Sequence, residues 1–378
     1  MSLRIGLFYP NARSIHAISP EVVAGNPDVL DLASHVAVSQ AAEEIGLDYL
    51  FMADAWGPYG PRATAMGLQD PMLLAPILAA ALFAGTTHIR FITTVHTSWF
   101  HPLLIARMGA ALDQLSNGRW GINLVSGSGF AEQLGGAPMR AIDHDARYIR
   151  AEETVEIITR AWAGARVDFD GEHFKIHGAL VGPRTRQQPR PLIVSAGASD
   201  AGRGFAGRHA DYIFMPGRTP LEECQRRVRD IRAIAAAAGR PPEAVRLQMH
   251  ASIIVRETAA AAAQVSQHLA DTVDLDAVAE YLNGIRSNIS TYDDIYASLG
   301  ELQMRQVGSV SGARKIHGGP QEVADGIQML AESFGCGGIA VTLPVWSPEE
   351  IRRFGRLVLP VLERRGLWQH PRTRDWAW

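Results

Sequence analysis

Short apolar runs alternate with longer amphipathic stretches along most of this 378-residue chain. Apolar runs separated by helical patterns indicate parallel strands that are covered on both faces. Eight such strand–helix pairs close a (β/α)8 barrel, whose reactive site lies at the C-terminal ends of the strands. The pattern therefore predicts an α/β fold of the TIM-barrel type, with a doubly wound open sheet as the alternative. The expected strands are Arg4–Phe8, Tyr49–Met52, Ile89–Thr94, Trp120–Leu124, Leu192–Ser195, Tyr212–Met215, Val245–Val255 and Gly338–Leu343.

Two segments exceed a minimal barrel. Residues 167–176 alternate apolar and polar side chains around Asp170-Gly171, which predicts a hairpin. Residues 256–317 predict a long helical insertion after the seventh strand. We therefore expect a single barrel domain over residues 1–366 and a C-terminal tail at 367–378. The helices expected between the strands are Leu30–Ile45, Pro71–Ala84, Leu103–Leu115, Ala146–Trp162, Ser199–Ala210, Leu221–Ala238, Pro320–Phe334 and Pro348–Arg365.

The charge and cysteine content argue against several classes of function. The formal net charge is −3, so no overall basic field is present to hold nucleic acid or an anionic membrane. No apolar stretch reaches the roughly 20 residues that a membrane span needs. The two cysteines, Cys224 and Cys336, are too far apart in sequence to indicate a disulfide framework or a cysteine-based zinc site. We expect a cytoplasmic protein.

The turn after the fifth expected strand is a candidate phosphate site. Residues 195–202 read Ser-Ala-Gly-Ala-Ser-Asp-Ala-Gly, in which a strand passes through small residues into a helix. Free N–H groups and the positive end of a helix dipole suit a phosphate. Gly197 allows close approach of the backbone and Ser199 adds a hydroxyl donor. Such turns also serve simply to pack a helix on a strand, so this alternative stays open.

Other candidate residues lie at or near the ends of the third, fourth and seventh strands. Asn123 is a polar amide inside an apolar strand, where it binds either a flat heterocycle or neighbouring side chains. Arg147 and Tyr148 open a helix and offer a guanidinium fork and an aromatic hydroxyl. His96 ends the third strand, and His250 lies at the centre of the polar side of the seventh, although a lone histidine is more often structural.

No metal-ligand spacing or nucleophile motif is evident in the sequence. A bound cofactor is therefore expected to carry the chemistry. The end of the insertion, residues 305–315, is glycine-rich and cationic. This composition predicts either a mobile lid or an ordinary solvated connection.

Four motifs resemble the bacterial luciferase-like, two-component flavin monooxygenases. They are Arg-Met-Gly-Ala-Ala-Leu-Asp-Gln-Leu-Ser-Asn-Gly-Arg at 107–119, Gly-Ile-Asn-Leu-Val-Ser-Gly at 121–127, His-Asp-Ala-Arg-Tyr at 144–148 and the turn at 195–202. The resemblance extends from Arg4 to about Glu363. It is strongest to the branch that holds alkanesulfonate monooxygenase, dimethylsulfone monooxygenase and the pyrimidine oxygenase. The combination of motifs is specific for the family, though not for one substrate.

The resemblance implies a TIM barrel with a long insertion after strand seven, and an FMN site at its mouth. It implies that Asn123 contacts the flavin ring edge, that Arg147 and Tyr148 line the site, and that Ser199 binds the FMN phosphate beside Gly197. Three further residues are implied to border the ring: Ala53, Asp54 and Thr94.

The resemblance also implies a reaction and its partners. Reduced FMN would arrive from a separate NAD(P)H-dependent flavin reductase and react with dioxygen, and a flavin (hydro)peroxide would oxygenate a small substrate. Asn123, His96 and His250 are the expected hydrogen-bond donors. The cationic lid residues would be Arg305, Arg314 and Lys315. Relatives of this kind are commonly oligomers, so a homodimer or homotetramer is expected.

Two departures from the sulfonate enzymes bear on the substrate. Those enzymes carry a cysteine after strand two, whereas residues 51–60 contain none, and their Arg-x-His pair falls on His250 and Ser252. Aromatic residues expected at the mouth favour an N-heterocycle or a sulfone over a sulfonate. These residues are Trp56, Tyr59, Trp99, Phe100 and Trp346. A deazaflavin-dependent oxidoreductase and a non-catalytic flavin-binding protein remain as alternatives.

Overall fold

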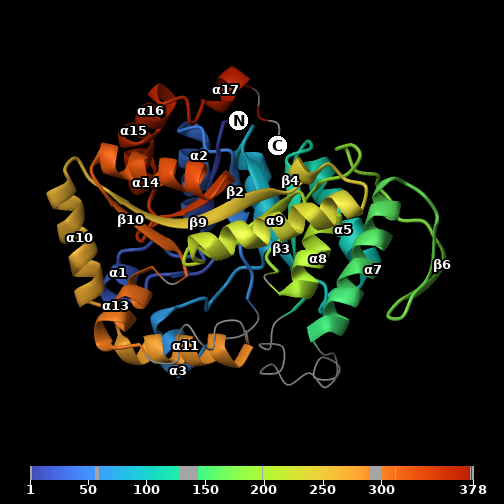
Figure 1. The fold of residues 1–378 in the computed structure, drawn as a ribbon, viewed down its shortest axis with the longest axis horizontal. Coiled ribbons are helices and arrows are strands. Elements are labelled where there is room, and N and C mark those ends of the chain that lie inside the picture. The colour runs from blue at the N-terminus through green and yellow to red at the C-terminus, as the bar shows by residue number, and fades with distance from the viewer. Residues whose placement is uncertain are drawn as a thin grey trace.

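In the computed structural model, the chain is wound into a barrel of parallel strands surrounded by helices (Figure 1). The structure describes residues 2–55, 59–127, 144–197, 199–288, 299–310, 312–374 and 376. Both chain ends lie at one end of the barrel, and helices α3 (Pro61–Met66) and α11 (Leu275–Asn288) lie at the other.

Eight parallel strands form a closed ring, which confirms the predicted TIM barrel. The ring runs β1-β2-β3-β4-β7-β8-β9-β11 and closes where β1 pairs with β11. Closure brings the C-terminal ends of all eight strands to one mouth. The strands are β1 (Arg4–Tyr9), β2 (Tyr49–Met52), β3 (Arg90–His96), β4 (Trp120–Val125), β7 (Leu192–Ser195), β8 (Tyr212–Met215), β9 (Arg246–Val255) and β11 (Cys336–Thr342).

Helices cover the outside of the ring and bury the largest apolar cluster against it. Local capping explains several helix ends: Asp31 and Ser347 each accept a hydrogen bond from backbone N–H groups at a helix start. The remaining helices of the described chain are α1 (Pro20–Ala24), α2 (Leu32–Glu44), α4 (Ala75–Leu82), α5 (Pro102–Leu115), α7 (His144–Trp162), α8 (Asp200–His209), α9 (Leu221–Ala237), α10 (Ala259–Asp271), α13 (Glu301–Val310), α14 (Pro320–Ser333), α15 (Pro348–Leu357), α16 (Leu359–Arg364) and α17 (Pro371–Arg374). In this described set, no helix has the length and apolar character to cross a bilayer.

The insertion is attached to the barrel by an additional strand that the sequence pattern did not predict. Strand β10 (Arg314–Gly318) pairs in parallel with the C-terminal half of β9, from Ala251 to Val255. Helices α11, α13 and α3 share a separate apolar cluster. The predicted hairpin is present as β5 (Val167–Asp170) and β6 (Lys175–Ala179).

The prediction of a glycine-rich loop at residues 305–315 is wrong, because the described residues of this segment lie largely in a helix, α13, and a strand, β10. Arg305 lies in α13, where Val307 and Val310 bury their side chains. Arg314 and Lys315 lie in β10 and follow the register of β9. Burial of one apolar face and pairing to an existing strand outweigh the local glycine content.

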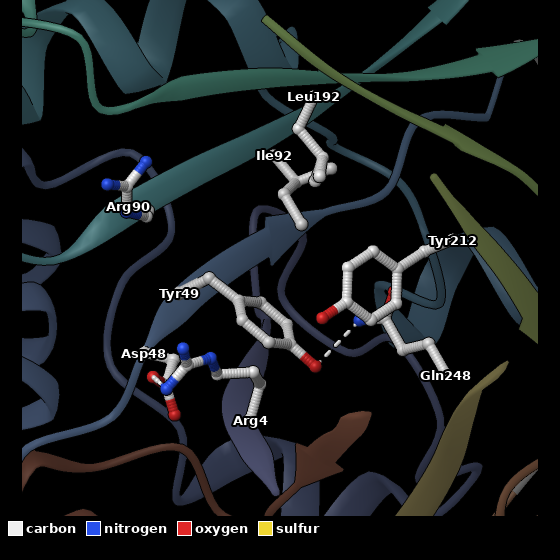
Figure 2. Close-up of a pocket in the computed structure, with 8 residues that line it drawn as sticks. All are labelled: Arg4, Asp48, Tyr49, Arg90, Ile92, Leu192, Tyr212 and Gln248. Atoms are coloured by element: carbon white, nitrogen blue, oxygen red, sulfur yellow. Dashed lines mark hydrogen bonds and ion pairs between the residues drawn. The ribbon is translucent and has the colours of Figure 1, made fainter. Parts of the chain in front are cut away.

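The N-terminal end of the barrel interior is packed with large polar and aromatic side chains. Figure 2 shows Tyr49 and Tyr212 facing each other there, with the Tyr49 hydroxyl accepting a 2.7 Å hydrogen bond from Gln248 Nε2. Arg4 and Asp48 lie at the edge of the same small pocket. This end is far from the strand ends that form the mouth, and its filled interior makes the barrel a packed core instead of a pore.

The C-terminal segment packs across this same end. Asp48 pairs with Arg374, and the Arg90 guanidinium donates to the Trp376 carbonyl. Trp376 also stacks on His88 with ring centroids 5.4 Å apart. The predicted tail at 367–378 is thus tied to the first three strands in its described part.

Gly6 tests the packing inside the barrel. A Cβ atom at this position would lie 2.1 Å from Tyr49 Cε2, so the ring would have to move. We expect Gly6→Ala to lower the free energy of unfolding by about 1–3 kcal/mol, as overpacking of a core does. Urea unfolding monitored by circular dichroism measures it. Gly300→Ala, where a Cβ makes only an ordinary contact, should change stability little; equal losses in both variants would contradict the packing argument.

Candidate functional site

The end of β2 is held by three side chains from neighbouring strand ends. Each one binds a successive backbone carbonyl as the strand leaves the barrel. The bonds are Thr94 Oγ1 to Met52 O (2.8 Å), Asn11 Nδ2 to Ala53 O (2.7 Å) and His96 Nε2 to Asp54 O (3.2 Å). Because consecutive carbonyls are bound, the path of residues 52–54 is set by side chains of the adjoining strands.

Asn123 lies beside this anchored segment. It is opposite Thr94 in the β3–β4 register, and its Nδ2 donates to Thr94 Oγ1 at 3.0 Å. Asn123 is 4% exposed, and its Oδ1 has no hydrogen-bond partner within the described chain. Thr94 therefore orients the amide and leaves a buried acceptor open.

Four more buried polar atoms near the mouth have no hydrogen-bond partner among the described residues, and we call all five the open polar atoms. Buried polar groups are normally paired, so a cluster of exceptions indicates a place for a ligand. Two of these atoms belong to side chains that lie beside Gly127. A Cβ atom at position 127 would be 2.7 Å from Ser98 Oγ and 3.6 Å from Arg147 Cδ. The five are Asn11 Oδ1, Asp54 Oδ2, Ser98 Oγ, Asn123 Oδ1 and Arg147 Nε.

Two ionisable groups at the mouth have strongly perturbed pKa values. Burial raises the pKa of Asp54 to about 7, and the Ala55 N–H opposes this shift only in part. Burial lowers the pKa of His96 to about 4, and its bond to the Asp54 carbonyl works in the opposite direction. A carbonyl oxygen can only accept, so the neutral imidazole carries its proton on Nε2. The Nε2–H group therefore donates its hydrogen bond to the Asp54 carbonyl oxygen.

The turn from β7 into α8 forms a compact cradle. Ser199 caps α8 and its Oγ accepts a 3.1 Å hydrogen bond from the Gly202 N–H. The Tyr148 hydroxyl lies against this turn, because a Cβ on Gly197 would come within 2.3 Å of it. Only glycine at 197 and 202 lets α7 and α8 approach this closely. The structure therefore brings Tyr148, Gly197 and Ser199 together.

His250 lies across the barrel interior from Asn123, in an aromatic cluster. Its ring stacks on Phe8 with centroids 4.5 Å apart and also contacts Phe214 and His16. The Thr342 hydroxyl lies 2.6 Å from its Nε2. Burial lowers its pKa well below the usual range, with His16 adding to the shift. His250 is thus a neutral member of the interior packing.

The cationic residues predicted for a lid do not gather at the mouth. Arg305 binds Glu301 and the carbonyls of Ala270 and Asp271. Arg314 lies over the Phe334 ring at 4.9 Å, and Lys315 is 3.4 Å from the Ser266 carbonyl.

The predicted aromatic mouth is only partly assembled. Trp99 and Phe100 follow β3 and are half-buried near the site. Trp346 belongs to the main core and donates from its indole N–H to Arg13 O, and Tyr59 packs edge-on against Tyr281 in the insertion cluster. Trp56 lies outside the described residues.

Sequence reasoning missed Asn11, His16 and Ser98. Asn11 is fully buried and lies two residues beyond the end of β1. A polar residue close to the end of a buried strand was the available indication for Asn11, and the same indication applies to Ser98, two residues beyond β3. Nothing in the local pattern identified His16, whose place depends on a loop folding back over Phe8 and His250.

Comparison with known proteins decides the family. The family model for luciferase-like monooxygenases matches residues 3–336. The chain belongs to this family. The resemblance inferred from the four motifs is thereby confirmed, and the protein is an oxidoreductase of the monooxygenase kind.

Relatives of similar length are found across nearly the whole chain. Nitrilotriacetate monooxygenase component A of Aminobacter aminovorans is 28% identical, covering 90% of this chain and 87% of its own. N-acetyl-S-(2-succino)cysteine monooxygenase of Bacillus subtilis (strain 168) is 29% identical, covering 88% and 85%. The crystal structure of riboflavin lyase with modified FMN and riboflavin superposes with a TM-score of 0.84 at 29% identity, covering 98% of this chain and 93% of the other.

The buried His96 predicts a pH dependence of stability. Its folded pKa is below the unfolded value near 6.5, so the unfolded chain binds the proton first as the pH falls. The contribution of His96 to stability should therefore be lost as the pH falls from about 6.5 towards 4. In His96→Gln this slope should lessen by roughly 1 kcal/mol per pH unit, as measured by urea unfolding at each pH. An unchanged slope in His96→Gln would contradict the assignment.

Proposed function

We propose that this protein is a flavin-dependent monooxygenase that uses reduced FMN and dioxygen to oxygenate a small organic substrate. The observation that carries the proposal is the cluster of open polar atoms at the mouth, next to a helix N-terminus. A flavin offers what these groups lack, because its ring edge carries both N–H donors and acceptors, and its side chain ends in a phosphate. The residues present thus fit the group.

Asn123 and Arg147 would hold the ring. The Asn123 oxygen is oriented by Thr94 and accepts an N–H, while the Arg147 Nε–H donates to a ring acceptor. Ala53 and Thr94 border the same space through the anchored end of β2. Polar groups oriented before a ligand arrives bind it without the cost of reorganisation.

Ser199 and the start of α8 would hold the phosphate. The Ser199 oxygen already accepts from Gly202 N–H, so its own proton is available for a phosphate oxygen. Ten residues of helix direct their dipole to this turn. Asp200, the acid in the first turn, points to solvent with a side chain 95% exposed and paired with Arg203, so it leaves the cradle clear.

Reduced FMN supplies two electrons, so that one atom of dioxygen enters the substrate and the other leaves as water. The chain itself orients the reactants and excludes water from the site. Below the mouth the barrel is closed by stacked rings, Phe8 on Phe51 and Phe51 on Phe214, with centroids 5.4 and 5.0 Å apart. Among the described residues, these rings separate the mouth from the N-terminal end of the barrel interior. His96 keeps Asp54 in place while staying neutral itself.

A separate NAD(P)H-dependent flavin reductase would supply the reduced FMN. The name of the Aminobacter relative, component A, supports a system of more than one protein. We propose an N-heterocycle, a sulfone or a sulfonate as the substrate class, with Trp99 and Phe100 favouring the first two. We also propose a homodimer or homotetramer.

Oxygen transfer tests the function directly. The protein is incubated with NADH, FMN and a free flavin reductase under 18O2, with uracil, dimethylsulfone, ethanesulfonate or nitrilotriacetate. We expect one 18O atom in one product, detected by mass spectrometry, and oxygen consumption that depends on the protein. Retained FMN without oxygen consumption would instead indicate a flavin-binding protein. Turnover with a reduced deazaflavin and no dioxygen would indicate the corresponding oxidoreductase.

Ser199→Ala tests the phosphate placement. It removes one charge-assisted hydrogen bond, so reduced FMN should bind more weakly by about 1–3 kcal/mol in an anaerobic titration. Ser347→Ala is the matched control because Ser347 caps α15 in the same way, by accepting from Glu350 N–H. Both variants lose a helix cap, but only Ser199→Ala should lose affinity. Equal dissociation constants would contradict the placement.

A further inference from the structure

Asp54 is a buried acid whose chemistry is not explained by ring contact alone. It follows β2 at the mouth, and its backbone carbonyl is bound by His96. Its Oδ2 is buried and, within the residues described, has no hydrogen-bond partner. The carboxyl group is therefore held by its backbone while its functional end remains available.

We propose that Asp54 is the general acid of the site, delivering its carboxyl proton to the oxygen atom that leaves as water. The assignment of this step rests on the proposed function. The protonation of Asp54 in the free protein does not, because it follows from the surroundings of the side chain.

Those surroundings contain little to stabilise a carboxylate. The hydrogen bonds described for this segment are to uncharged groups: Asn11 binds the preceding carbonyl, and Met72 Sδ accepts from Ala55 N–H. The Ala55 N–H lowers the pKa of the Asp54 carboxyl, but by less than burial raises it. His96 is neutral, and its Nε2–H donates a hydrogen bond to the backbone carbonyl of Asp54. Among the described residues, no charged side chain contributes to the pKa of Asp54, and burial brings that pKa to about 7. Near neutral pH, a large share of Asp54 is thus protonated and able to donate.

The position of Asp54 suits a donor to a bound reactant. Strand β3 lies between β2 and β4, and Thr94 on β3 binds both Met52 O and the Asn123 amide. Asp54 and Asn123 therefore flank the same strand end, one offering a proton and the other an acceptor. A pKa near the working pH is the condition under which a general acid is most effective.

The step balances as follows. The O–O bond breaks, a bond forms between the substrate and one oxygen, and the other oxygen takes the proton of Asp54 and a second proton to leave as water. The two electrons come from reduced FMN, which also releases two protons as it is oxidised. One of these restores the Asp54 carboxyl and the other completes the water.

Protonation can be measured on the free protein, without FMN or substrate. Infrared spectra of the wild type minus Asp54→Asn should show the carbonyl band of a protonated carboxyl at pH 5.5, which disappears with a midpoint near pH 7. Because the folded pKa of Asp54 is above its unfolded value, the contribution of Asp54 to stability is lost as the pH rises from about 4 through 7, opposite in sign to the contribution of His96. Asp54→Asn should lack this loss in urea unfolding. A band that is absent at pH 5.5 would overturn the proposal.

The role in the reaction is measured by turnover with the substrate found above. Asp54→Asn should lower kcat by about 100- to 10,000-fold with little change in reduced FMN affinity, and Asp54→Glu should restore part of it. In the wild type, kcat should fall as the pH rises through about 7, and in Asp54→Asn this decline should vanish. Asp170→Asn on the exposed hairpin serves as the control, with unchanged kcat.

The outcomes separate the two proposals. A titrating band with an unaltered kcat and pH profile in Asp54→Asn would overturn the general acid and leave the monooxygenase in place. A titrating band in a wild-type protein that oxygenates none of the substrates and consumes no oxygen would overturn the proposed function, and the proton transfer with it.

Discussion

Three side-chain hydrogen bonds to consecutive carbonyls at the end of β2 determine the shape of the mouth. Residues beyond a strand have lost their ladder partners, and unpaired carbonyls in a buried position are costly. Here Thr94, Asn11 and His96 supply the missing donors. Residues 53 and 54 therefore continue the path of β2 with their carbonyls bound, although the strand itself ends at Met52. These bonds fix the backbone of Asp54 on one side of β3, and Thr94 orients the Asn123 amide on the other side.

The barrel has polar side chains at its mouth and a layer of aromatic rings below them. The rings of Phe8, Phe51 and Phe214 close the space below the mouth. At the mouth, burial of the groups themselves raises the pKa of Asp54 and lowers that of His96. The same packing that stabilises the fold thus sets the protonation states at the site.

The sequence predicted the parts of the structure that follow from local pattern. Strands such as Tyr49–Met52 and Leu192–Ser195 have the expected bounds, because a buried parallel strand appears as a continuous apolar run. It did not predict β10, whose pairing with β9 requires a contact between distant segments. The family motifs led to Asn123, Tyr148 and Ser199. Trp346 was misplaced for a related reason, since a tryptophan suits a core as well as a mouth and only tertiary packing distinguishes them.

The pairing of Gly318 with Val255 places the entry and the exit of the insertion on neighbouring strands, about 4.8 Å apart. A segment that leaves and returns at nearly the same point imposes no strain on the framework, whatever its length, and each doubling of that length adds only about 0.6 kcal/mol of closure entropy. The insertion at residues 256–317 can therefore differ in length and sequence without a change in the barrel strands that it joins. Replacing it with the corresponding piece of a relative would alter what covers the barrel while leaving the eight-stranded scaffold undisturbed.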